Sequence, residues 1–95
     1  RGELPAGWDA DVRDFTAENG SVASRAASGV VLNQIAPRVP ELIGGSADLA
    51  GSTNTLLKGE ASFGPDAPGG RNFHWGIREH GMGAMMNGMA LHGGV

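Results

Sequence analysis

The sequence predicts an α/β fold built around a parallel sheet, and three observations support that prediction. Residues 21–36 carry apolar side chains on a 3.6-residue period, which is typical of a helix with one buried face. Leu42-Ile43-Gly44 is a short apolar run between chain breakers and suits a buried parallel strand. Phe73-His74-Trp75 is a second such run, and it leads directly into another helical pattern.

Residues 1–20 form a polar lead-in. The run Leu4-Pro5-Ala6-Gly7-Trp8 has the composition of a turn. Asp9 is expected to cap a short helix that carries Val12 and Phe15 on one side.

The helix that follows is predicted more strongly. Ser21 is its expected N-cap, and Pro37 and Pro40 end it because proline cannot continue a helix. Its apolar stripe consists of Val22, Ala23, Ala26, Ala27, Val30, Val31, Ile35 and Ala36.

The loop after the first strand is where chemistry is expected. The first strand runs into Gly45-Ser46-Ala47-Asp48-Leu49, and ligands of such sheets bind beyond the carboxyl ends of the strands. Residues 50–72 then read as one long loop, and loops of that length inside a compact fold are usually functional or mobile.

The last helix, from Ile77 or Arg78 to Leu91, has an unusual composition. Gly81, Gly83 and Gly88 each cost about 0.8–1.0 kcal/mol relative to alanine, so tertiary packing has to keep this segment helical. One face carries only small residues and the adjacent face carries methionines, which indicates a helix made for a buried interface. The small residues are Gly81, Ala84 and Gly88, and the methionines are Met82, Met86 and Met89.

Composition excludes several classes of protein. Ten acidic residues stand against seven basic ones, so no basic cluster favours nucleic acid or an anionic membrane. The chain has no cysteine, which excludes disulfide scaffolds and thiolate chemistry and fits a reducing compartment. No apolar run approaches the ~20 residues of a membrane span. A cytoplasmic location is the default expectation.

The ends of the sequence suggest a piece of a longer protein. The chain starts at Arg1 without a methionine and stops at Gly93-Gly94-Val95, directly after a patterned helix. Seventeen glycines also raise the conformational entropy lost on folding. We therefore expect an internal fragment without activity of its own.

Among single residues, Glu79 is the first candidate for catalysis. It opens the last helix, where the helix dipole favours the charged carboxylate and burial would favour the neutral acid. A carboxyl group between these influences can exchange protons near neutral pH. The alternative is that Glu79 only complements the helix dipole.

Other single residues support no site by themselves. His74, His80 and His92 lack the spacing of metal ligands, and the chain has neither a G-x-G-x-x-G motif nor a P-loop. Taken alone, Asp48 could cap a turn, Arg25 could solvate a helix face, and Ser52 could be an ordinary loop residue.

Taken together, the motifs are specific, because in their order along the chain they resemble those of transketolases. The resemblance covers nearly the whole chain, and the glycine-rich string at 44–49 and the string at 76–80 carry most of it. The matching strings are Ala23-Ser24-Arg25, Pro40-Glu41-Leu42-Ile43-Gly44-Gly45-Ser46-Ala47-Asp48-Leu49, Ser52, Gly76-Ile77-Arg78-Glu79-His80-Gly81-Met82, Asn87-Gly88-Met89 and Leu91-His92-Gly93-Gly94.

The resemblance implies a partial parallel-sheet pyrimidine-binding domain of a thiamine diphosphate enzyme. Residues 21–95 would be its N-terminal part, and residues 1–20 the connection from the preceding domain. In such enzymes a glutamate hydrogen-bonds N1′ of the cofactor's aminopyrimidine, and here that position is Glu79. The cofactor then carries a two-carbon ketol unit from a ketose phosphate to an aldose phosphate.

Further roles follow from the same resemblance. Arg25 and Ser52 match positions that bind the phosphate of the sugar, and Asp48 matches an aspartate beside the cofactor. Gly51 stands where many members have proline, which leaves Ser52 on a looser backbone. The divalent metal (Mg²⁺ or Ca²⁺) would be bound by the diphosphate-binding domain, outside this chain, and the cofactor would lie at the interface of a homodimer.

Three alternatives stay open at this point. A related ketolase, such as dihydroxyacetone synthase, shares the motifs and differs in the acceptor. A free-standing interaction module would fold cooperatively as a monomer, although its glycine- and methionine-rich helix would then be uncovered. A phosphate-binding module would use Arg25 and Ser52 and would not depend on Glu79.

Overall fold

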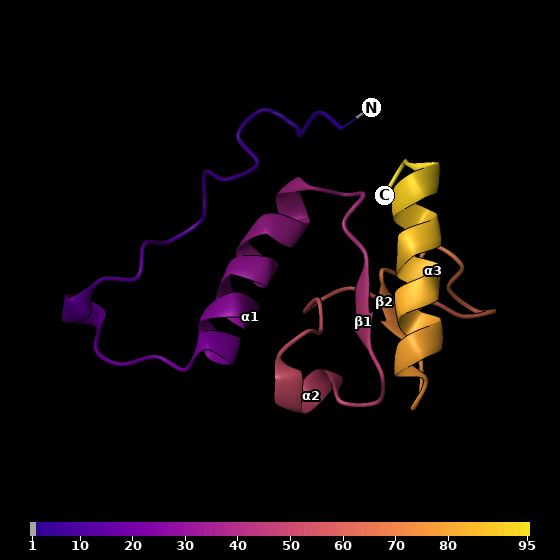
Figure 1. The fold of residues 1–95 in the computed structure, drawn as a ribbon. Coiled ribbons are helices and arrows are strands. Elements are labelled where there is room, and N and C mark those ends of the chain that lie inside the picture. The colour runs from indigo at the N-terminus through magenta and orange to yellow at the C-terminus, as the bar shows by residue number, and fades with distance from the viewer. Residues whose placement is uncertain (1) are drawn as a thin grey trace.

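The computed structural model describes residues 2–95, which form two strands and three α-helices. Figure 1 shows helices α1 and α3 flanking the two strands, with the short helix α2 at one end of the molecule. In chain order the elements are η1 (Ala17–Asn19), α1 (Ser24–Ile35), η2 (Ala36–Arg38), β1 (Gly44–Ser46), α2 (Ala50–Thr53), β2 (Asn72–His74) and α3 (Glu79–His92), where η marks a 3-10 helix.

The two strands are parallel, which confirms the predicted α/β fold with a parallel sheet. Gly44, Gly45 and Ser46 pair with Asn72, Phe73 and His74 in that order. The predicted positions of β2 and α3 are correct within one or two residues.

The first strand begins two residues later than the sequence predicted. Leu42 is still in a turn, since its N–H donates to the Val39 carbonyl and its own carbonyl accepts from Arg71 Nε. Pairing with the second strand starts only where the Gly44 N–H donates to the Arg71 carbonyl. The apolar side chains of Leu42 and Ile43 instead line a cavity beside α3.

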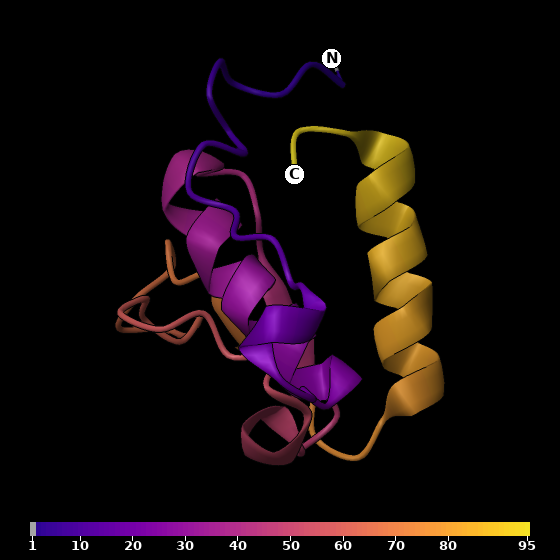
Figure 2. The same cartoon turned by 90° about the vertical axis from the view of Figure 1, so that its left-hand side faces the viewer.

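The lead-in contains turns where a helix capped by Asp9 was predicted, and that prediction is wrong. The Asp9 carbonyl accepts a turn hydrogen bond from Val12, and no continuous helical ladder follows. An ion pair of 2.6 Å between Arg38 and Asp11 holds this segment against the end of α1. In Figures 1 and 2 the lead-in runs alongside α1.

Helix α1 also begins later than predicted. Ala23, and not Ser21, is its N-cap, and no side chain caps the helix there. Its C-terminal end is as predicted, because Pro37 converts the last turn into the 3-10 helix η2. Gly29 is buried against the next segment, where an added Cβ would lie 2.8 Å from Asn54 Cβ.

The long loop predicted at 50–72 is wrong at its start, where residues 50–53 form α2, and the rest of it is bound to the fold. The Asn33 side chain accepts a hydrogen bond from the Lys58 N–H and donates to the Leu56 carbonyl, which joins the segment to α1. The Arg71 guanidinium donates to the carbonyls of Ala36 and Val39 and pairs with Glu60. Residues 54–71, called the 54–71 segment below, are therefore tied to both α1 and β2.

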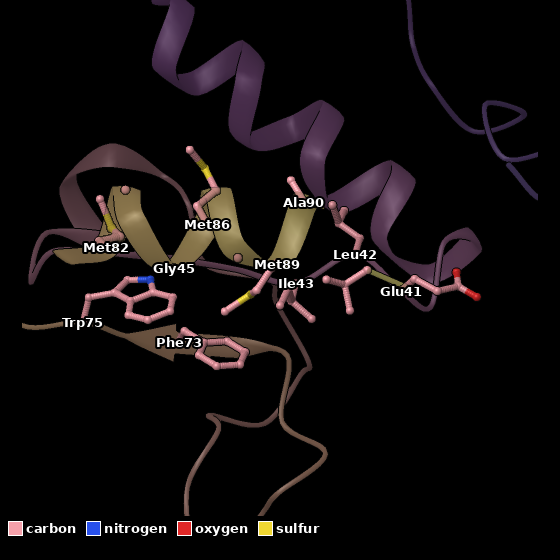
Figure 3. Close-up of a pocket in the computed structure, with 13 residues that line it drawn as sticks. Glu41, Leu42, Ile43, Gly45, Phe73, Trp75, Met82, Met86, Met89 and Ala90 are labelled. Atoms are coloured by element: carbon pink, nitrogen blue, oxygen red, sulfur yellow. The ribbon is translucent and has the colours of Figure 1, made fainter. Parts of the chain in front are cut away.

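The buried core is small. Its buried apolar residues are Ala36, Val39, Ala47 and Leu57. Between the sheet and α3 lies an apolar cavity of about 360 Å³, with Met82, Met86 and Met89 of α3 on one side and Phe73 and Trp75 on the other. Figure 3 shows these side chains around the cavity, while the Glu41 carboxylate points away from it.

The small-residue face of α3 is uncovered in the described part of the chain. Gly81, Ala84 and Gly88 are all exposed, and added Cβ atoms at Gly83 and Gly88 would meet nothing within 4 Å. On the methionine face, Met82 and Met89 are half-buried beside the cavity, and Met86 lines the same cavity but is 62% exposed. No helix in the described range is both long enough and apolar enough to cross a membrane.

Candidate active site at the carboxyl ends of the strands

The carboxyl ends of β1 and β2 lie side by side, because Ser46 pairs with His74 and the Trp75 N–H donates to the Ser46 carbonyl at 3.2 Å. The chain leaves β1 through Asp48 and leaves β2 toward Glu79. Both carboxylates are exposed. The structure therefore places these two predicted site residues at the same edge of the sheet.

Asp48 has a backbone conformation that is unusual for a residue with a side chain. Its φ is 72°, in the left-handed region, where aspartate is tolerated better than most residues. The Leu49 N–H donates to Ser46 Oγ at 3.3 Å across this turn. Left-handed non-glycine residues often occur at functional sites, and this turn carries the chain from β1 into α2.

Glu79 is the first residue of α3, in the position where a carboxylate is stabilised by the helix dipole. The chain reaches it through Gly76, whose φ is 66°. The side chains of Leu49 and Ile77, in the turns that precede α2 and α3, are 60% and 77% exposed. Exposed apolar side chains beside exposed carboxylates suit a ligand that has both an apolar ring and polar edges.

Arg25 lies at the start of α1 and Ser52 on α2, and both of these parts lie toward the same end of the molecule in Figures 1 and 2. A cavity of about 370 Å³ separates these helices, and it is lined by their chain neighbours Ala26 and Gly51 and by Lys58. Arg25 occupies the first turn of α1, where a cation is unfavourable for the helix and an anion would be favourable.

The Ser52 hydroxyl is engaged with its own helix. Its Oγ donates to the Leu49 carbonyl at 3.2 Å, so it can accept a further hydrogen bond but has to rotate before it can donate one to a phosphate. This is a geometric condition that the sequence does not reveal.

The histidines form no metal site in the described residues, where no group of three histidine, aspartate or glutamate side chains could hold a metal ion. His74 instead lies 2.9 Å from the Ser62 hydroxyl. Ser62 also forms a β-bridge with Asn72, which lies on β2 together with His74. The contact between His74 and Ser62 therefore helps to hold the 54–71 segment against β2.

Sequence reasoning missed one residue of this region. The Arg78 guanidinium turns back and donates from Nη1 to the Trp75 carbonyl at 2.8 Å. The available signal was an arginine directly before the helix, where serine, threonine, aspartate or asparagine is preferred.

Comparison with known proteins gives the family. The profile of the transketolase pyrimidine-binding domain matches residues 20–95. This chain belongs to the transketolase family. The resemblance drawn from its motifs is thereby confirmed.

Individual transketolases agree with this assignment. Those of Halalkalibacterium halodurans and Mycobacterium tuberculosis are 56% and 50% identical to the chain over 99% and 96% of its length. A crystal structure of Pichia stipitis transketolase with sedoheptulose 7-phosphate superposes with a TM-score of 0.84 at 48% identity over 92% of the chain. The Leishmania mexicana enzyme gives 0.83 at 39% identity over 93%.

The chain is short beside these transketolases. It spans 14% of the two bacterial proteins and 14% and 13% of the two chains of known structure. The similarity therefore concerns one part of the pyrimidine-binding domain.

Proposed function

We propose that the chain supplies the catalytic glutamate of a transketolase that moves a two-carbon ketol unit from a ketose phosphate to an aldose phosphate. The observation that carries this proposal is the position of Glu79. It is the first residue of α3, at the carboxyl edge of a parallel sheet, within the Gly-Ile-Arg-Glu-His string of a chain that belongs to the transketolase family.

The residues at this edge fit the aminopyrimidine of thiamine diphosphate. An exposed carboxylate is a suitable acceptor for a protonated ring nitrogen, and the exposed side chains of Leu49 and Ile77 offer apolar surface beside it. When bound, thiamine diphosphate supplies the electron sink for cleavage of the carbon–carbon bond.

In this proposal Glu79 holds and returns the proton at N1′ of the aminopyrimidine. The helix dipole stabilises the charged form of Glu79. The carboxylate can therefore accept a hydrogen bond from the protonated N1′. Asp48 lies on the neighbouring turn at the same edge and is proposed to contact the cofactor.

Arg25 and Ser52 are proposed to bind the phosphate group of the sugar. A guanidinium and a hydroxyl are suited to phosphate oxygens, and the uncapped start of α1 adds free N–H donors. The complex of the Pichia stipitis transketolase with sedoheptulose 7-phosphate supports a sugar phosphate as the substrate class.

The remaining parts of the proposal concern the complete protein. Residues 1–20 would connect the preceding domain to the pyrimidine-binding domain at 21–95, and the family match beginning at residue 20 supports this division. Arg1 itself lies outside the described residues. A divalent metal held elsewhere in the protein, a homodimer and a cytoplasmic location stay predictions.

The test is ketol transfer from xylulose 5-phosphate by the complete gene product at saturating cofactor, with Glu79→Gln beside wild type. We expect the turnover number to fall about 100-fold or more, since general acid–base catalysis contributes about 10²–10⁴-fold. Thiamine diphosphate should still bind. Glu18→Gln, on the exposed helix η1, is the control and should change neither quantity.

Near-normal turnover of Glu79→Gln would overturn the proposal. If the wild type bound the sugar phosphate without transferring a ketol unit, and Glu79→Gln bound it equally well, the chain would act as a phosphate-binding module.

A further inference from the structure

The turn that precedes Glu79 contains few hydrogen bonds. Residues 75–78 connect β2 to α3, and the Trp75 N–H is held to β1 by its bond to Ser46. Beyond Trp75 the main chain contributes one short bond within the turn, from the Arg78 N–H to the Gly76 carbonyl at 2.8 Å. The direction in which α3 leaves the sheet therefore depends on additional contacts.

The Arg78 side chain supplies such a contact. Its Nη1 donates to the Trp75 carbonyl at 2.8 Å, so the guanidinium spans the turn from the N-cap of α3 back to the first residue after β2. The same nitrogen occupies the space that a Cβ on Gly76 would need. Gly76 thus provides both the left-handed φ of 66° and the room for the guanidinium.

Helix stability does not explain an arginine at this position. Arg78 is the N-cap of α3, and it forms no side-chain capping bond there. A cation at the N-terminus of a helix is unfavourable, and a serine or aspartate would stabilise the helix better. What the arginine adds is the bond to Trp75, the residue whose N–H is held to β1.

We infer that Arg78 is a positioning residue for Glu79. Its bond to the Trp75 carbonyl fixes the first turn of α3 relative to the sheet, and so fixes where the Glu79 carboxylate lies. This inference rests on the proposed role of Glu79, because only a carboxylate that meets a reacting group needs such placement. Small errors in placing a catalytic group can cost about 100-fold in rate.

The first readout needs no cofactor. Hydrogen exchange of the backbone amides at 78–84, measured by mass spectrometry on the complete apo protein, should become faster in Arg78→Met, because this range contains the hydrogen-bonded N–H groups of Arg78 and Met82. Methionine keeps the apolar stem and loses every donor. Arg78→Lys retains one donor that can reach a carbonyl and should restore part of the protection.

The second readout is exchange of the C2 proton of bound thiamine diphosphate for deuterium in the holoenzyme. Arg78→Met should slow it about 10- to 100-fold, the scale expected for a displaced catalytic group. The cofactor dissociation constant and the melting temperature should stay near the wild-type values. Arg13→Gln, in the lead-in, is the control. It should leave the amide exchange, the C2 exchange, the cofactor dissociation constant and the melting temperature unchanged.

A double variant separates positioning from a general structural role. If Arg78 acts through Glu79, adding Arg78→Met to Glu79→Gln should slow C2 exchange no further. A further loss of the same size as in the single variant would overturn the inference.

The two hypotheses fail in different ways. If Glu79→Gln keeps the wild-type C2 exchange rate, the proposed function is wrong. If Glu79→Gln slows exchange and Arg78→Met does not, only the inference about Arg78 is wrong. Arg78→Gln is the second variant if Arg78→Met does not fold, and failure of both to fold would assign Arg78 a structural role and overturn the inference.

Discussion

Asn72 binds Leu57 through both atoms of its side-chain amide. Its Oδ1 accepts from the Leu57 N–H and its Nδ2 donates to the Leu57 carbonyl, both at 2.8 Å. The amide thus pairs with the main chain as a neighbouring strand would. Asn72 is 2% exposed and Leu57 1% exposed, so this pair joins β2 to the 54–71 segment inside the core.

Replacing Asn72 should destabilise the fold. Asn72→Ala leaves the Leu57 N–H and the Glu60 carbonyl without their partner, and the Leu57 carbonyl keeps only the turn hydrogen bond from the Glu60 N–H. Each buried group left unsatisfied costs about 1–3 kcal/mol, so we expect a loss at least of that size in the free energy of unfolding. Urea unfolding of the complete protein measures it. Asn87→Ala, on the exposed side of α3, is the control and should be neutral; equal stability of both variants would contradict the assignment.

Gly45 should not tolerate a side chain. An added Cβ would overlap the Phe73 carbonyl and lie 2.7 Å from Trp75 Nε1, so the strands would have to separate. Gly45→Ala should therefore cost about 1–3 kcal/mol, as overpacked positions do. Gly51→Ala adds the same methyl group where nothing lies within 4 Å and is the matched control. Thermal melting of both variants decides the matter, and an unchanged melting temperature for Gly45→Ala would contradict the close approach of the two strands.

The attachment of the lead-in should depend on pH. The hydrogen bond from Arg38 holds the pKa of Asp11 below its ordinary value, so folding with the pair formed favours the ionised carboxylate. This contribution is present above the ordinary carboxyl pKa of about 4 and is lost as the pH falls through the lower folded value. Hydrogen exchange of the lead-in amides, corrected for intrinsic rates, should therefore become faster as the pH falls through that range.

Asp11→Asn should show the faster exchange already at neutral pH. Arg38→Gln should match it, and the double variant should add nothing. Exchange that stays slow in both single variants would mean that the bond from the Arg13 N–H to Gln34 Oε1 holds the lead-in by itself.

Arg25 should matter for phosphorylated substrates only. In the complete enzyme, Arg25→Gln should raise KM for a ketose phosphate about 10- to 100-fold, since a hydrogen bond to a charged group contributes about 1.5–3 kcal/mol. KM for the same ketose without phosphate, and the affinity for thiamine diphosphate, should not change. Arg13→Gln serves as the control. Equal effects on both ketoses would remove Arg25 from the phosphate site.

The pattern of the sequence predicts the elements that tertiary packing reinforces. The helix at 79–92 and the strand at 72–74 are predicted by patterns of neighbouring residues, and the structure contains both. The strand at 44–46 is displaced from the apolar run because Arg71, far away in the sequence, binds the Leu42 carbonyl and ends the turn there. The helix expected after Asp9 is absent, and its segment is instead bound to η2 through the ion pair of Asp11 with Arg38, a contact that no local pattern encodes.

The motifs predict the candidate site, whereas its geometry could not be predicted from the sequence, and the roles of its residues stay predictions. The strings around Asp48 and Glu79 identify the family, and the parallel pairing of the strands then places both residues at one edge. The engagement of the Ser52 hydroxyl with Leu49 and the bond from Arg78 to Trp75 depend on side-chain conformations. Neither can be deduced from residue types and spacing alone.

The tip of the 54–71 segment can accept a change of length. The base of the segment is fixed through Asn33, Asn72 and Arg71, whereas residues 64–69 form an exposed tip closed on itself by a bridge between Gly64 and Ala67. Lengthening such a tip costs little, since each doubling of a loop adds only about 0.6 kcal/mol of closure entropy. A peptide epitope or a fluorescent reporter inserted between Pro65 and Asp66, inside the bridge, should leave the carboxyl edge of the sheet undisturbed, so this tip offers an attachment point on the protein.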